Sequence, residues 1–409
     1  MFQLKSLHDL LVLKQYQMYV KSGFIRDTMV ALLYALRICG MAPVSIVRKK
    51  SGYQFRVLRS YALYGYILIS CLITTHAYLY ISNAASLKSH IKNNTFNATT
   101  FMWITETFTS VIPTIVASLN GYRRMEKFIE HLKWLDKTSA KIKIPRQNGR
   151  IYKIIIILVI LTRFFLDASY IYILVDNFGI RSLLSYMYVS AIIKYFLICL
   201  LQMHIYDSYL EVSLKIGYIK DELQDLVDNR LCDDSTHSFY RHSVDEKVKK
   251  LHDLLDNIKT IYLKLNKHFE IIFFFILVNI VIRIILCFYG ISYIIQNGFE
   301  ESSHYWDGSP FWSLGLYGIH NFVTIFVVIQ PFRVIACELA YIKLLMGRMM
   351  TLKNYAFRIF PNVDFFHKDL ISYDFSYTPL GIITIQRSII IKVLAIGITC
   401  LAAILQFQK

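Results

Sequence analysis

Charged residues are scarce in this chain of 409 residues. Asp, Glu, Lys and Arg make up 18% of it, against about 25% in an average soluble domain, while 55% of the residues are hydrophobic. Such an excess of apolar over charged side chains indicates that lipid forms part of the solvent around the folded chain. We therefore expect an all-α, helical membrane protein.

Acidic residues are the scarcer of the two charged kinds. The chain has 28 Asp and Glu against 45 Lys and Arg, which leaves a formal net charge of +17. A strong positive charge can indicate nucleic-acid binding, but no basic domain stands apart from the hydrophobic runs. We interpret the charge as the positive-inside bias of a membrane protein and expect no nucleic-acid partner.

Signs of a metal centre, a disulfide framework or catalysis are missing from the sequence. The seven cysteines lie mostly in or beside apolar runs, and none has a CxxC or Cys/His spacing. There is no HExxH-type or other polar catalytic constellation, and no internal repeat of the kind that many transporters contain. The first residues also lack the order of a signal peptide. We expect neither a cofactor nor an enzyme.

Seven hydrophobic runs are long enough to cross a bilayer, which takes roughly 20 mainly apolar residues. They cover residues 60–87, 101–122, 151–175, 183–206, 269–295, 308–332 and 388–407. A further apolar run, 29–47, is interrupted by Arg37, Gly40 and Pro43. We interpret it as a helix in the cytoplasm or on the membrane surface, because it is short and broken.

Lys and Arg fall almost entirely on one side of these runs. The segments on the side of the N-terminus hold 35 of them and the segments on the other side hold 3. This asymmetry predicts a cytoplasmic N-terminus and, with seven spans, an extracellular C-terminus. Two glycosylation sequons, at Asn93 and Asn97, lie in the first predicted external loop and agree with that orientation.

The predicted spans divide the chain into six parts. These are a cytoplasmic segment (1–59), spans one to four (60–207), cytoplasmic helical extensions with a loop (208–268), spans five and six (269–335), a cytoplasmic helix and linker (336–387), and the last span (388–409). Leu223 and Leu254 belong to apolar stripes at helical spacing in the extensions. We expect these stripes to pack in a shared helical base, within one subunit or between subunits, and to supply subunit contacts.

The C-terminus carries the most specific motif of the chain. Residues 399–407 read Thr-Cys-Leu-Ala-Ala-Ile-Leu-Gln-Phe, and Asp374-Phe375 leads through Arg387 into this last run. The pattern resembles that of insect gustatory receptors, which end in Thr-Tyr, five apolar residues and Gln-Phe after an Asp-Phe lead-in. The chain departs from it at Cys400, which stands in place of the Tyr.

The resemblance implies a ligand-gated cation channel in which the last helix from each of four subunits lines the pore. By position it places Gln406 and Phe407 at the gate. The spacing of the residues supports a pore face independently of the resemblance, because Lys392, Thr399, Ala402 and Gln406 share one face of the last helix. A small and polar stripe suits a water-filled pore, but it also suits close helix packing, and the spacing alone does not separate the two.

Ligand-binding candidates lie in the outer halves of the spans, where the resemblance places the tastant pocket. They are Trp312, Tyr317, His320 and Asn321 of the sixth run, with Tyr170 and Tyr186 of the third and fourth. Aromatic walls with a few hydrogen-bonding groups suit a small organic ligand, although an interfacial aromatic belt has the same composition. Arg163 and Asp167, four residues apart, are expected to face each other as an ion pair.

The function expected from the sequence is that of a gustatory receptor in the plasma membrane, gated by a small organic tastant. It would be a homotetramer or a heteromer with other gustatory receptors and would conduct cations. Bitter or plant-derived compounds are the favoured class of ligand. A sugar-type gustatory receptor and an insect odorant receptor stay open as alternatives. A G-protein-coupled receptor is a remote alternative, because its N-terminus lies outside the cell.

Overall fold

The computed structural model describes most of the chain. The described residues are 16–21, 27–49, 52–88, 105, 107–118, 124–130, 133, 150–178, 183–230, 238–302, 311–356, 361–382, 384–386 and 388–407. The sequons at Asn93 and Asn97 lie outside them. In a few stretches inside the helices, including Trp312, Cys400 and Phe407, the structure describes the backbone only.

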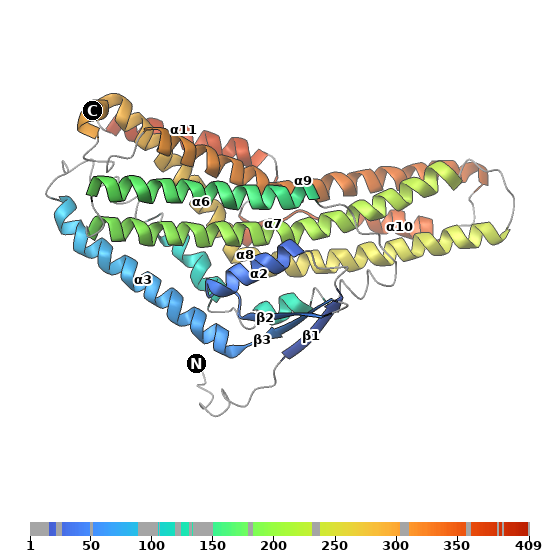
Figure 1. Cartoon of the computed structure of the whole chain (residues 1–409). Coiled ribbons are helices and arrows are strands. Elements are labelled where there is room, and N and C mark those ends of the chain that lie inside the picture. Colours follow the sequence, from blue (N-terminus) through green and yellow to red (C-terminus); the bar gives the residue numbers. More distant parts are fainter. Residues whose placement is uncertain are drawn as a thin grey trace, which may run out of the picture.

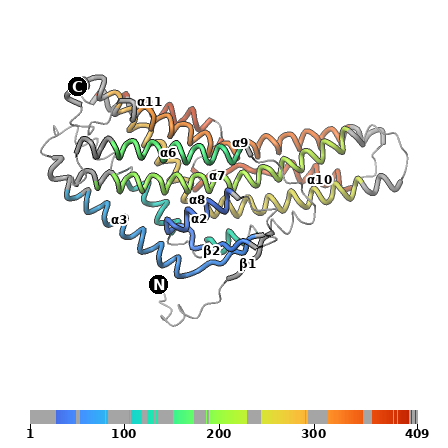
Figure 2. The backbone as a smooth tube through the Cα atoms, in the orientation of Figure 1, coloured from blue at the N-terminus to red at the C-terminus, as the bar shows by residue number. Residues whose placement is uncertain are grey.

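Helices dominate the fold (Figure 1). They are α2 (Asp27–Ile38), α3 (Arg59–Lys88), α6 (Arg150–Phe178), α7 (Leu183–Arg230), α8 (Ser238–Ser302), α9 (Phe311–Ala356), α10 (Pro361–Ser372), the short 3-10 helix η1 (Pro379–Gly381) and α11 (Ser388–Phe407). Shorter helical segments cover 107–118 and 124–130. The long helices run lengthwise beside one another, α3 crosses them obliquely, and α11 lies at the end where the chain finishes (Figures 1 and 2).

Five of the described helices contain stretches long and apolar enough to cross a membrane. These stretches are Arg59–Leu79, Ile151–Tyr172, Val189–Asp228, Val244–Tyr289 and Gly315–Thr351. Two of the other predicted spans coincide with the shorter apolar helices Thr107–Ser118 and Ser388–Thr399. The prediction of a helical membrane protein is confirmed.

Three helices continue well beyond the hydrophobic runs. The second halves of α7 and α9 and the first half of α8 pack together with α10, and we call this part the base (Figure 1). The apolar stripes predicted there are buried: Leu223 is 0% exposed and Leu254 is 2% exposed. They pack within one chain, so the expectation that they supply subunit contacts is wrong. An apolar stripe on a solvated helix must be covered, and the sequence could not show that the same chain covers it.

A small sheet, which was not predicted from the sequence, precedes the first span. Strands β1 (Tyr16–Lys21), β2 (Val44–Lys49) and β3 (Gly52–Val57) form an antiparallel sheet in the order β1-β3-β2. The helix expected over 29–47 ends at Ile38, a turn covers residues 39–43, and β2 begins at Val44. The alternation of buried Val44 and Ile46 with more exposed neighbours is typical of a strand.

Two glycines allow the turn after α2 to lie against α3. Gly40 has a φ of +74°, a backbone conformation that glycine adopts at little cost and that commonly ends helices. A Cβ on Gly65 would come within 2.0 Å of the Gly40 carbonyl oxygen. The hydroxyl of Tyr64 donates to the Ile38 carbonyl at 2.8 Å, which fastens the same crossing. The N-terminal segment is thereby held on the first span.

Candidate functional site

The predicted spans enclose a buried ion pair on α6. The Arg163 guanidinium donates from Nε to Asp167 Oδ2 at 2.9 Å, and its Nη2 lies 2.8 Å from Oδ1. The side chains are only 1% and 6% exposed. The four-residue spacing predicts this pairing, which offsets part of the cost of removing both charges from water.

Tyr317 of α9 contacts both members of this ion pair. Its hydroxyl donates to Asp167 Oδ1 at 2.8 Å, and its ring lies 5.0 Å from the Arg163 guanidinium carbon. Tyr170 meets the same ring edge to face, with centroids 5.9 Å apart. The structure therefore brings together two of the predicted ligand residues, Tyr170 and Tyr317, around one carboxylate.

The ring of Tyr195, on α7, lies beside three cations. The guanidinium carbons of Arg283 and Arg163 are 4.1 Å and 5.3 Å from its centroid, and Lys194 Nζ is 4.8 Å away. Cation–π contacts are strongest where water is excluded, and these three cations are all buried. Tyr195 links the ion pair on α6 to α8, and it was not among the residues predicted from the sequence. Its position next to Lys194 was the only signal.

His320 and its neighbours on α9 border the same polar cluster. His320 Nδ1 is 3.5 Å from the Thr162 hydroxyl of α6, and His320 is 8% exposed. Asn321 and Thr324 are also buried, at 3% and 2% exposure. Buried polar groups of this kind can hold and orient a small ligand within apolar walls.

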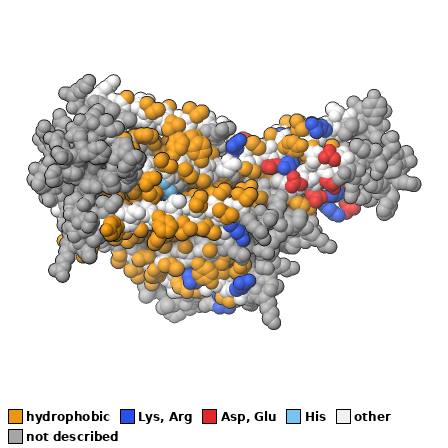
Figure 3. Space-filling model, turned by 45° about the horizontal axis from the view of Figure 1, so that its top comes forward, with side chains coloured by type: hydrophobic (Ala, Val, Ile, Leu, Met, Phe, Trp, Pro, Cys, Tyr) orange, Lys and Arg blue, Asp and Glu red, His pale blue; other side chains and the backbone are white. Residues whose placement is uncertain are grey.

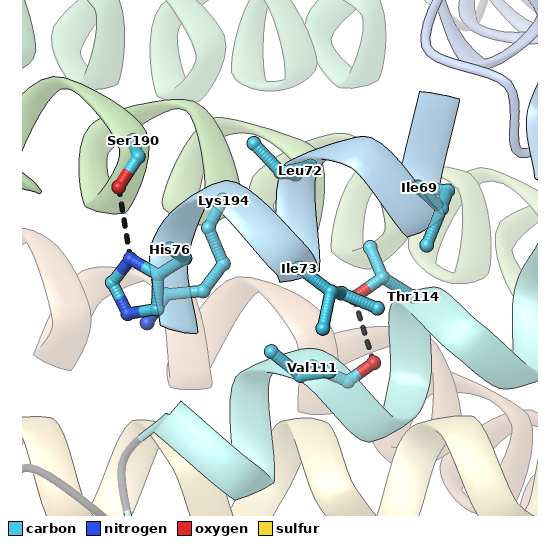
Figure 4. Close-up of a pocket in the computed structure, with 8 residues that line it drawn as sticks. All are labelled: Ile69, Leu72, Ile73, His76, Val111, Thr114, Ser190 and Lys194. Carbon is cyan, nitrogen blue, oxygen red and sulfur yellow. Dashed lines mark hydrogen bonds between the residues drawn. The ribbon is translucent and has the colours of Figure 1, made fainter. Parts of the chain in front are cut away.

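A small cavity lies beside the cluster, between α3, α7 and the helix over 107–118 (Figure 4). His76 Nδ1 and the Ser190 hydroxyl are 2.8 Å apart at one end, next to Lys194. Ile69, Leu72, Ile73, Val111 and Thr114 line the rest. The cavity measures about 10 Å³, enough for roughly one water molecule. A drug-sized ligand therefore needs these helices to move apart.

The other predicted ligand residues do not join the cluster in the described structure. Tyr186 is 52% exposed and faces outward. Trp312 lies in the first turn of α9, but its side chain is outside the described residues. A role for either in binding stays a prediction.

The predicted pore stripe on α11 faces away from its own subunit. Lys392, Thr399, Ala402 and Gln406 are all exposed, whereas Ile389 and Val393 are buried. α11 packs on α8, where a Cβ at Gly397 would lie 3.9 Å from Ile285. The Thr399 hydroxyl donates to the Ala395 carbonyl at 2.8 Å. The stripe is thus free to face other subunits or a pore, and Phe407 has no described side chain.

The linker before α11 is fastened to the base by aromatic residues. The Tyr262 hydroxyl of α8 donates to the Phe375 carbonyl at 2.6 Å, and Tyr377 stacks on Phe332 of α9 with centroids 5.4 Å apart. The Leu380 N–H donates to Glu270 of α8 at 3.2 Å. A movement of α8 or α9 would therefore pull on the linker and on α11.

Asp374, the first residue of the lead-in motif, shapes the start of this linker. Its carboxylate accepts from the Ser376 N–H at 2.7 Å and from the Ser376 hydroxyl at 2.9 Å. These hydrogen bonds lower the pKa of Asp374. The turn that they stabilise directs Phe375 into the base, where it is 7% exposed.

A family model for 7tm chemosensory receptors matches residues 30–409, nearly the whole chain. The chain belongs to the 7tm chemosensory receptor family. This places the receptor among membrane proteins and outside the enzyme families. The family match does not distinguish a gustatory receptor from an odorant receptor.

Solved structures add a match in fold. The insect olfactory receptor OR5 from Machilis hrabei aligns with a TM-score of 0.59 at 12% identity, over 92% of this chain and 97% of that one. The same protein in complex with eugenol aligns with a TM-score of 0.50 over the same shares. At this identity the likeness shows a shared fold. No curated protein matches the sequence.

Proposed function

We propose that this receptor is a gustatory receptor of the plasma membrane, a non-selective cation channel that a small organic tastant opens. The exposed stripe of Lys392, Thr399, Ala402 and Gln406 on α11 carries the proposal. A single helix cannot enclose a pore, so several subunits must bring their stripes together. Small and polar side chains along such a pore let water and ions pass.

The ligand would bind among α6, α7, α8 and α9, in the outer half of the bundle. Tyr317 contacts the Arg163–Asp167 pair there, and Tyr170 contacts the Tyr317 ring. With the buried His320 and Asn321 of α9 they offer aromatic faces and hydrogen-bonding groups. The olfactory receptor from Machilis hrabei is known in complex with eugenol, which supports a small organic ligand here. Bitter or plant-derived compounds are the favoured class.

A series of contacts connects this cluster to the pore helix. Tyr317 and His320 lie on α9, which also carries Phe332, and Phe332 stacks on Tyr377 of the linker. Arg283 lies on α8, against which α11 packs. Ligand entry that separates these helices would shift the linker and turn α11.

An odorant receptor is the second candidate, because the likeness to a solved olfactory receptor supports it. The Gln406-Phe407 ending favours the gustatory branch. Expression in cells, with current recorded during a screen of alkaloids, plant phenols, sugars and volatile odorants, would separate the two. A response confined to volatile compounds would overturn the gustatory assignment.

Variants in the same recordings test the site and the pore separately. His320→Ala should weaken the ligand response without changing surface expression, while His367→Ala on α10 should leave it unchanged. Gln406→Glu should increase cation selectivity and block by divalent cations, since up to four carboxylates would surround the axis. If Gln406→Glu conducts like the parent, the pore lies elsewhere. If neither histidine variant differs from the parent, the ligand binds outside this cluster.

A further inference from the structure

The chain between α10 and α11 begins with an extended segment that packs on the base. We call residues 373–382 the strap. Its side chains alternate, because Tyr373, Phe375, Tyr377 and Pro379 are buried and the residues between them are more exposed. Such a period of two is typical of an extended segment with one face against a packed surface. One face of the strap is therefore held by the helices of the base.

α8 contacts the strap along four successive turns. The contacting residues of α8 lie three or four positions apart and so share one face of that helix. In chain order they are Lys259, Tyr262, Asn266 and Glu270, and they meet Tyr373, Phe375, Tyr377 and Leu380 of the strap. The strap and α8 thus run in the same direction. The strap cannot slide along α8 without breaking several of these contacts.

Leu380, at the end of this series, has a strained backbone. Its φ of +53° and ψ of +18° lie in the left-handed region. Among the residues that the structure describes, it is the one non-glycine residue with a positive φ. There the Cβ of an L-residue crowds the backbone, so the conformation is less favourable than the right-handed one. Gly381 follows with a φ of +68°, but glycine has no Cβ and adopts this conformation at little cost.

Hydrogen bonds hold Leu380 in this conformation. Its N–H donates to Glu270 Oε1 at 3.2 Å, and the next two N–H groups donate to the carbonyls of Thr378 and Pro379 at 3.0 Å and 3.2 Å. The side chain contributes little, because it is 41% exposed. Strained backbone persists only where the surrounding contacts outweigh its cost. Of these contacts, the one to Glu270 is lost if α8 moves away from the strap.

The strap leads to the pore helix. The Ile385 N–H donates to the Tyr377 carbonyl at 2.8 Å, and α11 begins at Ser388. In Figure 3 charged side chains gather over the base, while the middle of the same face is largely hydrophobic. The strap thus connects the charged base to an apolar helix. A change of conformation at Leu380 would therefore alter the position at which α11 starts.

We propose that Leu380 and Glu270 form a conformational switch that sets how readily the channel opens. Glu270 holds the strained turn while α8 and the strap keep the described arrangement. When α8 moves, the Leu380 N–H loses its acceptor, the turn relaxes to an ordinary conformation, and α11 moves with it. The strain makes the described arrangement easier to leave. This inference rests on the channel function proposed above.

Substitutions that change the backbone preference at Leu380 test the switch. Leu380→Gly and Leu380→Asn adopt the left-handed conformation more readily than leucine and should favour the described arrangement. Leu380→Val adopts it less readily, because valine is β-branched, and should disfavour that arrangement. Glu270→Ala removes the acceptor and should act in the same direction as Leu380→Val.

Two measurements compare these variants, and neither needs a known ligand. Hydrogen–deuterium exchange of the purified full chain, corrected for intrinsic rates, reports the opening of the strap. Leu380→Gly should slow this exchange about fivefold and Glu270→Ala should speed it about fivefold, since the first relieves one strained residue and the second removes one hydrogen bond. Current recorded without ligand, at equal surface expression, should rise above that of the parent in one of these two variants and fall below it in the other.

Matched controls separate strain from other effects of the substitutions. Leu380→Ala loses the side chain but keeps a Cβ, so it should stay within about twofold of the parent in both measurements. Glu270→Gln keeps an oxygen as acceptor and should also behave like the parent. Asparagine is less flexible than glycine, so Leu380→Asn should still slow exchange if left-handed preference is the cause. It also replaces Leu380→Gly if that variant fails to fold.

Two results would overturn the proposal. The first is equal exchange in Leu380→Gly, Leu380→Asn and Leu380→Ala, which would mean that relieving the left-handed strain does not stabilise the strap. The second is a change in exchange with unchanged currents, which would mean that the turn has no effect on opening. A parent that carries no current with or without ligand contradicts the channel function instead, and the exchange measurement still decides whether the turn is strained.

Discussion

At the scale of single residues, Asp167 holds the polar cluster together. It receives hydrogen bonds from Arg163 and Tyr317, whose ring also contacts Tyr170. Arg163 in turn lies against Tyr195, which contacts Lys194 and Arg283. One carboxylate thus connects helices α6, α7, α8 and α9, and its removal should weaken the packing of all four.

Asp167→Asn tests this role. The change leaves Arg163 buried without a counter-ion, which should lower the stability by about 3–5 kcal/mol. Thermal unfolding in detergent, followed by size-exclusion chromatography with fluorescence detection, measures the effect. Asp253→Asn, at an exposed position of α8, is the control and should unfold like the parent. Adding Arg163→Met to Asp167→Asn should restore part of the loss, and no recovery would argue against an uncompensated charge as its cause.

At the scale of elements, α10 is fastened to α8 in the base by a shared carboxylate. Asp369 accepts from the Tyr373 hydroxyl at 2.7 Å and lies 2.9 Å from His252 Nε2. Lys259 Nζ is 3.7 Å from the Tyr373 ring centroid. Burial raises the pKa of Asp369, but the hydrogen bonds from Tyr373 and His252 outweigh it, and the net pKa is lowered.

The lowered pKa predicts an acid-dependent loss of stability. A carboxyl group whose pKa falls on folding stabilises the protein above its unfolded pKa of 3.8, and this contribution disappears as the pH drops through the folded pKa. At pH 5 there should be a difference in unfolding temperature between the parent, which should unfold at the higher temperature, and Asp369→Asn. It corresponds to about 1 kcal/mol, since the carboxylate is partly exposed.

Below about pH 4 that difference should shrink towards zero. Scanning fluorimetry from pH 8 to pH 3 measures it, with Asp253→Asn as the control that should show no such trend. A difference that stays the same at pH 3 would mean that Asp369 acts through packing and not through its charge.

At the scale of the whole molecule, the base presents apolar side chains outward. Phe365 and Ile371 of α10 are 62% and 66% exposed, and Ile382 of the linker is 63% exposed. Outside the lipid such residues favour contact with another protein surface. Because Leu223 and Leu254 are buried within the chain, these exposed residues replace them as the expected subunit contacts.

Phe365→Ser with Ile371→Ser should weaken subunit assembly. Native mass spectrometry in detergent should show a tetramer for the parent and smaller species for the variant. Leu161→Ser, at an exposed position of α6 that faces lipid, is the control and should stay assembled. An unchanged tetramer in the base variant would place the contacts elsewhere, and a monomeric parent that still conducts would contradict the multi-subunit pore.

The orientation of the whole chain is a separate prediction. An epitope tag at the N-terminus should stain only after permeabilisation, and a C-terminal tag should stain in intact cells, because the basic segments stay in the cytoplasm. Removal of N-linked sugar should shift the parent on a gel but leave Asn93→Gln with Asn97→Gln unchanged. N-terminal staining of intact cells would reverse the topology.

The sequence by itself determined the class of fold, the helical runs and the internal pattern of each helix. Hydropathy and spacing act locally, so the pairing of Arg163 with Asp167 and the buried stripes through Leu223 and Leu254 could be predicted from neighbours on one helix. The family could be predicted because the lead-in at Asp374-Phe375 and the ending at Gln406-Phe407 are short, continuous motifs. Strand β2 was missed because the apolar run 29–47, in which it begins, fits a helix equally well until Gly40 turns the chain.

Only the tertiary structure decided which helices share the cluster and which surfaces face outward. Tyr195, His76 and Ser190 take part through contacts between helices, and such contacts leave no periodic signal in the sequence. Whether an apolar stripe faces its own chain or a partner depends on how the helices cross. That is why Leu223 is buried within the subunit while Phe365 is exposed.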